Sequence, residues 1–272
     1  MAHTVRALVV TGNGTNCERE MAAACRLGGA DVVDIVHIYK LLGGETRLAD
    51  YDFLNLPGGF LDGDDLGSAK ANATRLRYAA TLQGGSLYEQ ICSFIAAGKL
   101  ILGICNGFQL LVKLGLIPDL AGAHEQETTL TFNDSGRFED RWVHLQVNEN
   151  SPCVFTRGIK RLYLPVRHGE GKFVVRDDAV LERLHAQQLV AVRYADAEGQ
   201  QTMHYPANPN GSIDAIAGIC DASGRVFGMM PHAEAFLHRT NHPRWTAEEL
   251  PDEGQGVVLF RNAVDYLRNR RT

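Results

Sequence analysis

The segment from residue 100 to residue 114 constrains the fold of this chain more than any other. Residues 100–104 have the apolar character of a buried strand and residues 108–114 have the spacing of a helix. Between them, Cys105 is flanked by Gly103 and Gly107, which is the layout of a nucleophile elbow. The pattern predicts that the Cys105 thiol stands above a sheet at a helix N-terminus, where the thiolate is favoured. The alternative is a structural cysteine at a strand end.

Strands and helices alternate along the first half of the chain. Strands are predicted at residues 5–10, 31–38 and 51–56, and helices at 17–27 and 87–97. Such alternation favours a mostly parallel sheet with helices on both faces, as in flavodoxin-like α/β folds. Residues 66–85 are polar and alanine-rich, and we expect a surface insertion or an extra helix there.

The second half has a different pattern. Strands are predicted at 142–147 and 189–194, and a hairpin at 213–219 and 226–230, with few helices between them. A last amphipathic helix is expected at 256–271. These strands predict an antiparallel extension of the same sheet. We find no linker, so residues 1–272 are expected to form one domain.

Composition excludes several classes of protein. The net charge of −5 shows no basic excess, so no nucleic-acid partner is expected. No run approaches the about 20 apolar residues of a membrane span, and the apolar stretch 7–10 is too short for a signal peptide. The six cysteines are scattered without metal-finger spacing, as expected for free thiols in the cytoplasm.

A cysteine nucleophile needs a base, and the base needs an orienting group. His232 follows the predicted strand 226–230, and Glu234 is two residues further on, within reach of the other imidazole nitrogen. Because active sites of α/β sheets lie at strand ends, this pair is our candidate for base and orienter. His168, in a loop rich in glycine and charge, is a rival for the base.

Two backbone groups are candidates for binding an oxyanion. The N–H of Asn106 directly follows the nucleophile at the predicted helix start. Gly59 belongs to the Pro57–Gly58–Gly59 turn that closes the third strand, where a glycine exposes its N–H to the cleft. An ordinary turn would explain the glycine pair equally well.

Cys105 in its elbow followed by His232-x-Glu234 resembles the class I, or triad, glutamine amidotransferases. Further segments are similar to the glutaminase subunits of phosphoribosylformylglycinamidine synthases, which act in purine biosynthesis. These segments begin or end at Cys17, Pro57, His168, Asn210 and Gly228 and together span about residues 5 to 240. The chain departs from the family pattern in two places. Ala233 and Ala235 replace the Pro and Arg of the usual Pro-His-Pro-Glu-Arg, and the segment after Asp64 also differs from the usual one.

The resemblance implies a role for each site residue. Cys105 would form a γ-glutamyl thioester, His232 would exchange protons and Glu234 would orient His232. Gly59 and Asn106 would hold the oxyanion, and Gln109, Gly169 and Glu170 would bind glutamine. The family also implies a partner synthetase subunit, with a small accessory subunit as an open question.

Other interpretations are weaker. The Gly12–Asn13–Gly14 turn lacks the third glycine of a dinucleotide loop, because Cys17 holds that place. A DJ-1-like or peptidase-like cysteine hydrolase, another triad amidotransferase and a non-catalytic module stay open as alternatives. The spacing of His124, His168 and His232 does not support a metal site. The sequence has no Walker A motif, so we expect ATP and magnesium on the partner synthetase.

Overall fold

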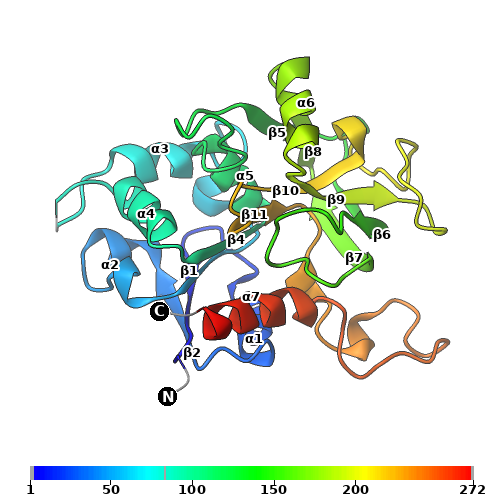
Figure 1. The fold of residues 1–272 in the computed structure, drawn as a ribbon, viewed down its shortest axis with the longest axis horizontal. Helices are drawn as coiled ribbons and strands as arrows, with labels where there is room; N and C mark the ends of the chain where they lie inside the picture. Colours follow the sequence, from blue (N-terminus) through cyan, green and yellow to red (C-terminus); the bar gives the residue numbers. More distant parts are fainter. Residues whose placement is uncertain (1–2, 83, 271–272) are drawn as a thin grey trace.

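A nine-stranded sheet runs through the centre of the molecule in the computed structural model, which describes residues 3–82 and 84–270 (Figure 1). Its strand order is β2-β1-β3-β4-β11-β10-β9-β6-β7. The strands are β1 (Arg6–Thr11), β2 (Val32–His37), β3 (Phe53–Leu56), β4 (Leu100–Ile104), β6 (Glu139–Val147), β7 (Arg161–His168), β9 (Val190–Ala195), β10 (Ile216–Cys220) and β11 (Val226–Met229).

The sheet has a parallel half and an antiparallel half. Strands β2, β1, β3, β4 and β11 are parallel, and β10, β9, β6 and β7 continue the sheet with antiparallel pairings. Every residue of β3 and β4 is buried, as expected for parallel strands covered on both faces. The α/β architecture and its antiparallel extension, including the β10–β11 hairpin, are confirmed.

Helices cover both faces of the parallel half (Figure 1). Helices α1 (Glu18–Leu27) and α7 (Val257–Asn269) pack against each other on one face. The other face carries α2 (Ile38–Leu42), α3 (Lys70–Tyr78), α4 (Leu87–Ala96) and α5 (Asn106–Lys113). A capping box between Ser86 and Glu89 fixes the start of α4.

Several elements differ from the sequence-based expectation. Strands β5 (Thr128–Phe132) and β8 (Glu170–Val175) form a separate two-stranded sheet, and α6 (Asp178–Ala186) lies beside it. None of these three was predicted. The segment around His168 is the junction of β7 and β8, not a loop, because Gly169 alone separates the two strands.

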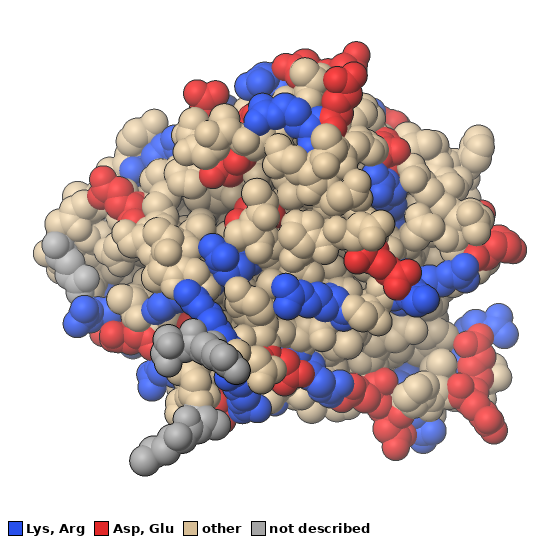
Figure 2. Space-filling model, viewed as in Figure 1, with Lys and Arg blue, Asp and Glu red and all other residues tan. Residues whose placement is uncertain are grey.

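Residues 66–85 contain α3, whose Leu76 is buried in the core, and Gln83 lies outside the described residues. The last helix ends at Asn269, and the Arg271 end of the prediction also lies outside the described residues. Among the described residues, no helix is long and apolar enough to cross a membrane. On the face shown in Figure 2, the basic and acidic side chains of the described residues are interspersed.

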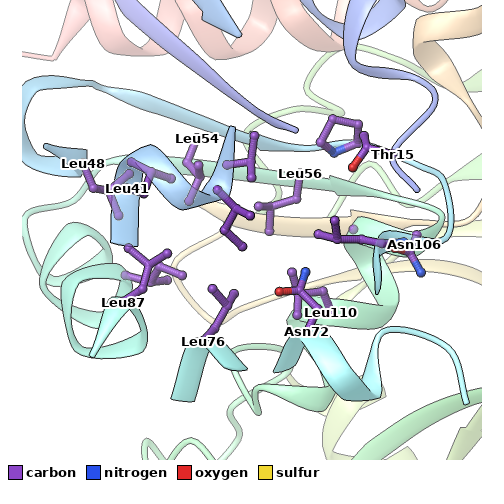
Figure 3. Close-up of a pocket in the computed structure, with 16 residues that line it drawn as sticks. Thr15, Leu41, Leu48, Leu54, Leu56, Asn72, Leu76, Leu87, Asn106 and Leu110 are labelled. Atoms are coloured by element: carbon purple, nitrogen blue, oxygen red, sulfur yellow. Dashed lines mark hydrogen bonds between the residues drawn. The ribbon is translucent and has the colours of Figure 1, made fainter. Parts of the chain in front are cut away.

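A small apolar cavity lies between the sheet and helices α2 to α5 (Figure 3). Its volume is about 30 Å³, which is enough for one or two water molecules but not for an amino acid. Its wall is mostly aliphatic, with Leu54, Leu76 and Leu110 among the lining residues, and the Asn72 Oδ1 there has no hydrogen-bond partner within residues 3–82 and 84–270.

Candidate active site

Cys105 occupies a strained turn between β4 and α5. Its φ of 53° and ψ of −107° place a non-glycine residue at positive φ, a conformation that folds retain mainly at functional sites. The flanking glycines are sterically required: a Cβ on Gly107 would lie 1.9 Å from the Leu56 carbonyl oxygen, and one on Gly103 would lie 2.6 Å from the Gly107 oxygen. The predicted strand–turn–helix geometry is therefore present at Cys105.

His232 and Glu234 lie side by side beyond the end of β11. His232 Nδ1 is 2.6 Å from Glu234 Oε1, and the two residues are only 2% and 1% exposed. The His232 backbone N–H donates to the Pro165 oxygen at 2.8 Å, which fixes this segment against β7. Although burial lowers the pKa of His232, the negative charges of Glu234 and Cys105 outweigh it and raise that pKa well above its ordinary value.

The two catalytic candidates face each other across Gly58. A Cβ built on Gly58 would lie 2.8 Å from His232 Cε1 and 3.4 Å from Cys105 Cβ. His232 Nε2 has no hydrogen-bond partner among the described residues. The Glu234 side of the ring is thus occupied, and the opposite nitrogen is available for a proton from the thiol.

His168 is also close to the site but is bonded differently. Its Nδ1 lies 3.1 Å from Asn133 Oδ1, an oxygen that also accepts from Gly171 N, so this ring nitrogen carries the proton. Burial, together with the charge of His232, lowers the pKa of His168 to about 3. A histidine with so low a pKa is a weak base at neutral pH. The geometry therefore favours His232 over its rival.

A cleft of about 400 Å³ opens in front of these residues. Pockets of this size accommodate small ligands. The cleft is lined by six residues that the sequence predicted for the site: Gly59, Cys105, Gln109, Gly169, Glu170 and His232. Glu234 lies behind His232, outside the lining, as an orienting residue would.

Asn106 does not line this cleft with its side chain. Its Oδ1 accepts from Leu61 N at 3.1 Å, and its Nδ2 donates to Asp64 at 2.9 Å and to Gln109 at 3.0 Å. The side chain thus ties the loop after β3 to α5. As the first residue of α5, Asn106 leaves its backbone N–H without a partner in the helix.

Gln109 and Glu170 are held together in the lining of the cleft. Gln109 Nε2 donates to the Glu170 carbonyl oxygen, and a Glu170 side-chain oxygen accepts from Ser68 N at 3.3 Å. Gly171 next to them has no room for a side chain, because a Cβ would lie 2.3 Å from the His168 ring. Gly171 therefore serves close packing.

Sequence reasoning assigned no role in the site to Cys17 or Arg167. Cys17 Sγ lies 3.9 Å from His232 Nδ1, and Arg167 Nη2 lies 3.9 Å from the same sulfur. Cys17 follows the carboxyl end of β1, in the same row of strand ends as Cys105 and His232. That position was the one signal in the sequence that could have placed it in the site.

Comparison with known proteins agrees with this geometry. Residues 4–267 match the model of the CobB/CobQ-like glutamine amidotransferase domain family. A phosphoribosylformylglycinamidine synthase subunit PurQ of Dehalococcoides mccartyi is 46% identical over 97% of this chain and 98% of its own length. The chain belongs to the PurQ family.

Other PurQ relatives and solved structures extend the comparison. A PurQ of Methanococcus maripaludis is 40% identical over 96% of this chain and 97% of its own length. The structure of PurLQS from Thermotoga maritima matches with a TM-score of 0.71 and 29% identity, covering 97% of this chain and all of the matched chain. A glutamine amidotransferase from Thermotoga maritima, 18% identical with a TM-score of 0.57, covers 98% of this chain and all of its own and shares the fold.

Proposed function

We propose that this chain hydrolyses glutamine to glutamate and ammonia, as the glutaminase subunit of a phosphoribosylformylglycinamidine synthase. The observation that supports this most is the strained Cys105 facing the buried His232–Glu234 pair across one cleft. Membership of the PurQ family supports the same activity and its place in purine biosynthesis.

Acylation would begin with the proton of Cys105. It passes from Sγ to His232 Nε2, and the thiolate attacks the side-chain amide carbon of glutamine. The tetrahedral intermediate then collapses: the C–N bond breaks, His232 Nε2 gives its proton to the leaving nitrogen, and ammonia departs. A γ-glutamyl thioester is left on Cys105.

Deacylation repeats the proton transfers with water. His232 takes a proton from a water molecule that attacks the thioester carbon, and the C–S bond breaks as glutamate forms. The proton returns from Nε2 to the sulfur. Glu234 keeps the ring in the tautomer with a proton on Nδ1 throughout and stabilises the imidazolium that forms in each step.

The backbone N–H groups of Gly59 and Asn106 would hold the oxyanion in both steps. The Asn106 side chain also helps to position Gly59, because its Oδ1 accepts a hydrogen bond from Leu61 N in the loop that contains Gly59. Glu170 presents a carboxylate in the cleft that suits the α-ammonium group of glutamine, and Gln109 and Gly169 complete that wall.

The ammonia would be used by a partner synthetase subunit that converts formylglycinamide ribonucleotide to formylglycinamidine ribonucleotide. We place the ATP and magnesium of that step on the partner, with a small accessory subunit as a further component. The similarity to PurLQS supports such a complex. All six cysteines are free, which is compatible with the cytoplasmic location that we propose.

A glutaminase assay with and without the synthetase tests the proposal. Wild-type protein should release glutamate from glutamine, and Cys105→Ala should not. Cys92→Ser, on the helix α4 away from the cleft, is the matched control for removal of a cysteine. Hydrolysis of peptides in place of glutamine would favour the peptidase-like alternative, and full turnover by Cys105→Ala would refute the mechanism.

A further inference from the structure

Cys17, His232 and Glu234 form a compact group of metal-ligating side chains, in which the Cys17 sulfur and a Glu234 oxygen both lie near Nδ1 of the His232 ring. One ligand atom from each lies within 4.8 Å of the other two. The three residues are 5%, 2% and 1% exposed, and Glu234 Oε2 is a buried carboxylate oxygen with no hydrogen-bond partner in the part of the chain that the structure describes. This oxygen is thus available to bind a metal ion.

The distances are close to those of a bound ion. Cys17 Sγ and His232 Nδ1 are 3.9 Å apart, whereas a tetrahedral zinc with Zn–S of about 2.3 Å and Zn–N of about 2.0 Å would hold them about 3.5 Å apart. Small shifts of two side chains close that gap. Cys17 and His232 both line the cleft, which gives an ion a route to them.

The chemistry of the ligands selects the metal. Thiolate, imidazole and carboxylate together suit zinc, whereas magnesium prefers oxygen ligands only. With Cys17 and Glu234 both ionised, a divalent cation is neutralised by its own ligands. Burial raises the pKa of the Cys17 thiol, and Arg167, 3.9 Å from the sulfur, opposes that rise by favouring the thiolate, although its charge also opposes a cation.

We propose that Cys17, His232 Nδ1 and Glu234 bind a zinc ion, with water from the cleft as the fourth ligand, and that this ion reversibly inhibits the enzyme. One proton leaves on binding, from the Cys17 thiol, while the neutral ring exchanges its proton on Nδ1 for one on Nε2. A ring bound to metal through Nδ1 holds its proton on Nε2 and cannot accept the proton of Cys105. The inhibition rests on the proposed function, whereas the binding does not.

Zinc binding to the full chain is measured in the absence of glutamine, by competition with a chromophoric chelator. We expect one ion per chain for wild type. Cys17→Ser and Cys17→Ala should each weaken binding by at least about tenfold, the lower end of what outer-shell changes cost at zinc sites. Cys105→Ala should bind as wild type does, and so should Cys92→Ser. Magnesium should not compete.

Cobalt provides a readout that does not depend on the Cys17 variants folding. Co²⁺ bound to Cys105→Ala should show a thiolate-to-cobalt charge-transfer band, because the sulfur ligand is Cys17. Wild-type activity should fall as zinc binds and return with a chelator. No stoichiometric zinc binding, or binding that is lost in Cys105→Ala and kept in both Cys17 variants, would overturn the proposal. An inactive wild type that still binds zinc would refute the proposed function alone.

Discussion

His232 Nδ1 lies 2.6 Å from Glu234 Oε1, in a place where neither residue is more than 2% exposed. The contact is local in sequence, but it depends on the fold, since the His232 backbone is bonded to Pro165 of β7. A carboxylate in this position holds the imidazole proton on Nδ1 and leaves Nε2 free toward the thiol. Three strands therefore position the catalytic group. Cys105 follows β4, His232 follows β11, and β7 holds the His232 backbone in place.

Glu234→Gln should abolish most of the glutaminase activity while the protein stays folded. The amide cannot stabilise the imidazolium and can favour the wrong tautomer, a change that costs roughly 10⁴-fold in kcat in serine proteases. We expect a loss of between about 10² and 10⁴ in kcat, measured as glutamate release. Glu182→Gln, on the exposed side of α6, is the control and should leave kcat unchanged. A Glu234→Gln variant with wild-type kcat would contradict the orienting role.

Gly58→Ala should damage catalysis more than stability. The added Cβ would lie 2.8 Å from His232 Cε1 and 3.4 Å from Cys105 Cβ, so it would push the base away from the nucleophile. A displacement on this scale can cost on the order of 10²-fold in rate. The free energy of unfolding, measured with denaturant, should change less, since Gly58 does not have a positive φ that alanine would strain. Equal kcat values for Gly58→Ala and wild type would show that catalysis does not depend on the present separation of Cys105 and His232.

Much of this site could be predicted from sequence because its signals are local. The elbow at Cys105 needs only a strand, two glycines and a helix, and all of them lie within fifteen residues. The His232–Glu234 pair is equally local. The β10–β11 hairpin was predictable for the same reason, since a short turn joins two apolar runs.

What was missed depends on contacts between distant segments. Strand β7 includes Pro165, which normally argues against a strand, but β7 is the edge strand of the sheet and tolerates a missing donor. Strands β5 and β8 pair with each other although two strands of the main sheet, β6 and β7, lie between them in the sequence. The approach of Cys17 to His232 joins the first and last parallel strands of the chain, and no local pattern announces it.

Glu170→Gln should weaken the binding of glutamine with little effect on the chemical step. The variant keeps an oxygen for Ser68 N but loses the charge that suits the substrate's α-ammonium group. Charge-assisted hydrogen bonds contribute about 1.5–3 kcal/mol, so KM should rise roughly 10- to 100-fold at nearly constant kcat. Steady-state glutaminase kinetics measure both. A fall in kcat with KM unchanged would assign Glu170 to the reaction itself and not to binding.

His168 should make the folded state sensitive to acid. Its pKa is lowered to about 3 in the folded protein, by burial first and then by the charge of His232, against about 6.5 when unfolded. Between these two values the unfolded chain binds the additional proton, so the free energy of unfolding falls as pH decreases from about 6.5 toward about 3. The contribution of this one residue approaches about 1.4 kcal/mol per pH unit within that window.

The comparison of wild type with His168→Gln isolates this effect. The variant removes the titrating group, so its unfolding free energy, measured by denaturant titration at several pH values, should fall less steeply with acid. At neutral pH it should be less stable than wild type, because the Nδ1 hydrogen bond to Asn133 is lost from a buried place. His3→Gln replaces a half-exposed histidine and serves as the control. Parallel acid limbs for wild type and His168→Gln would mean that the ring has the same pKa in the fold as in the unfolded chain, which its burial and its bond to Asn133 argue against.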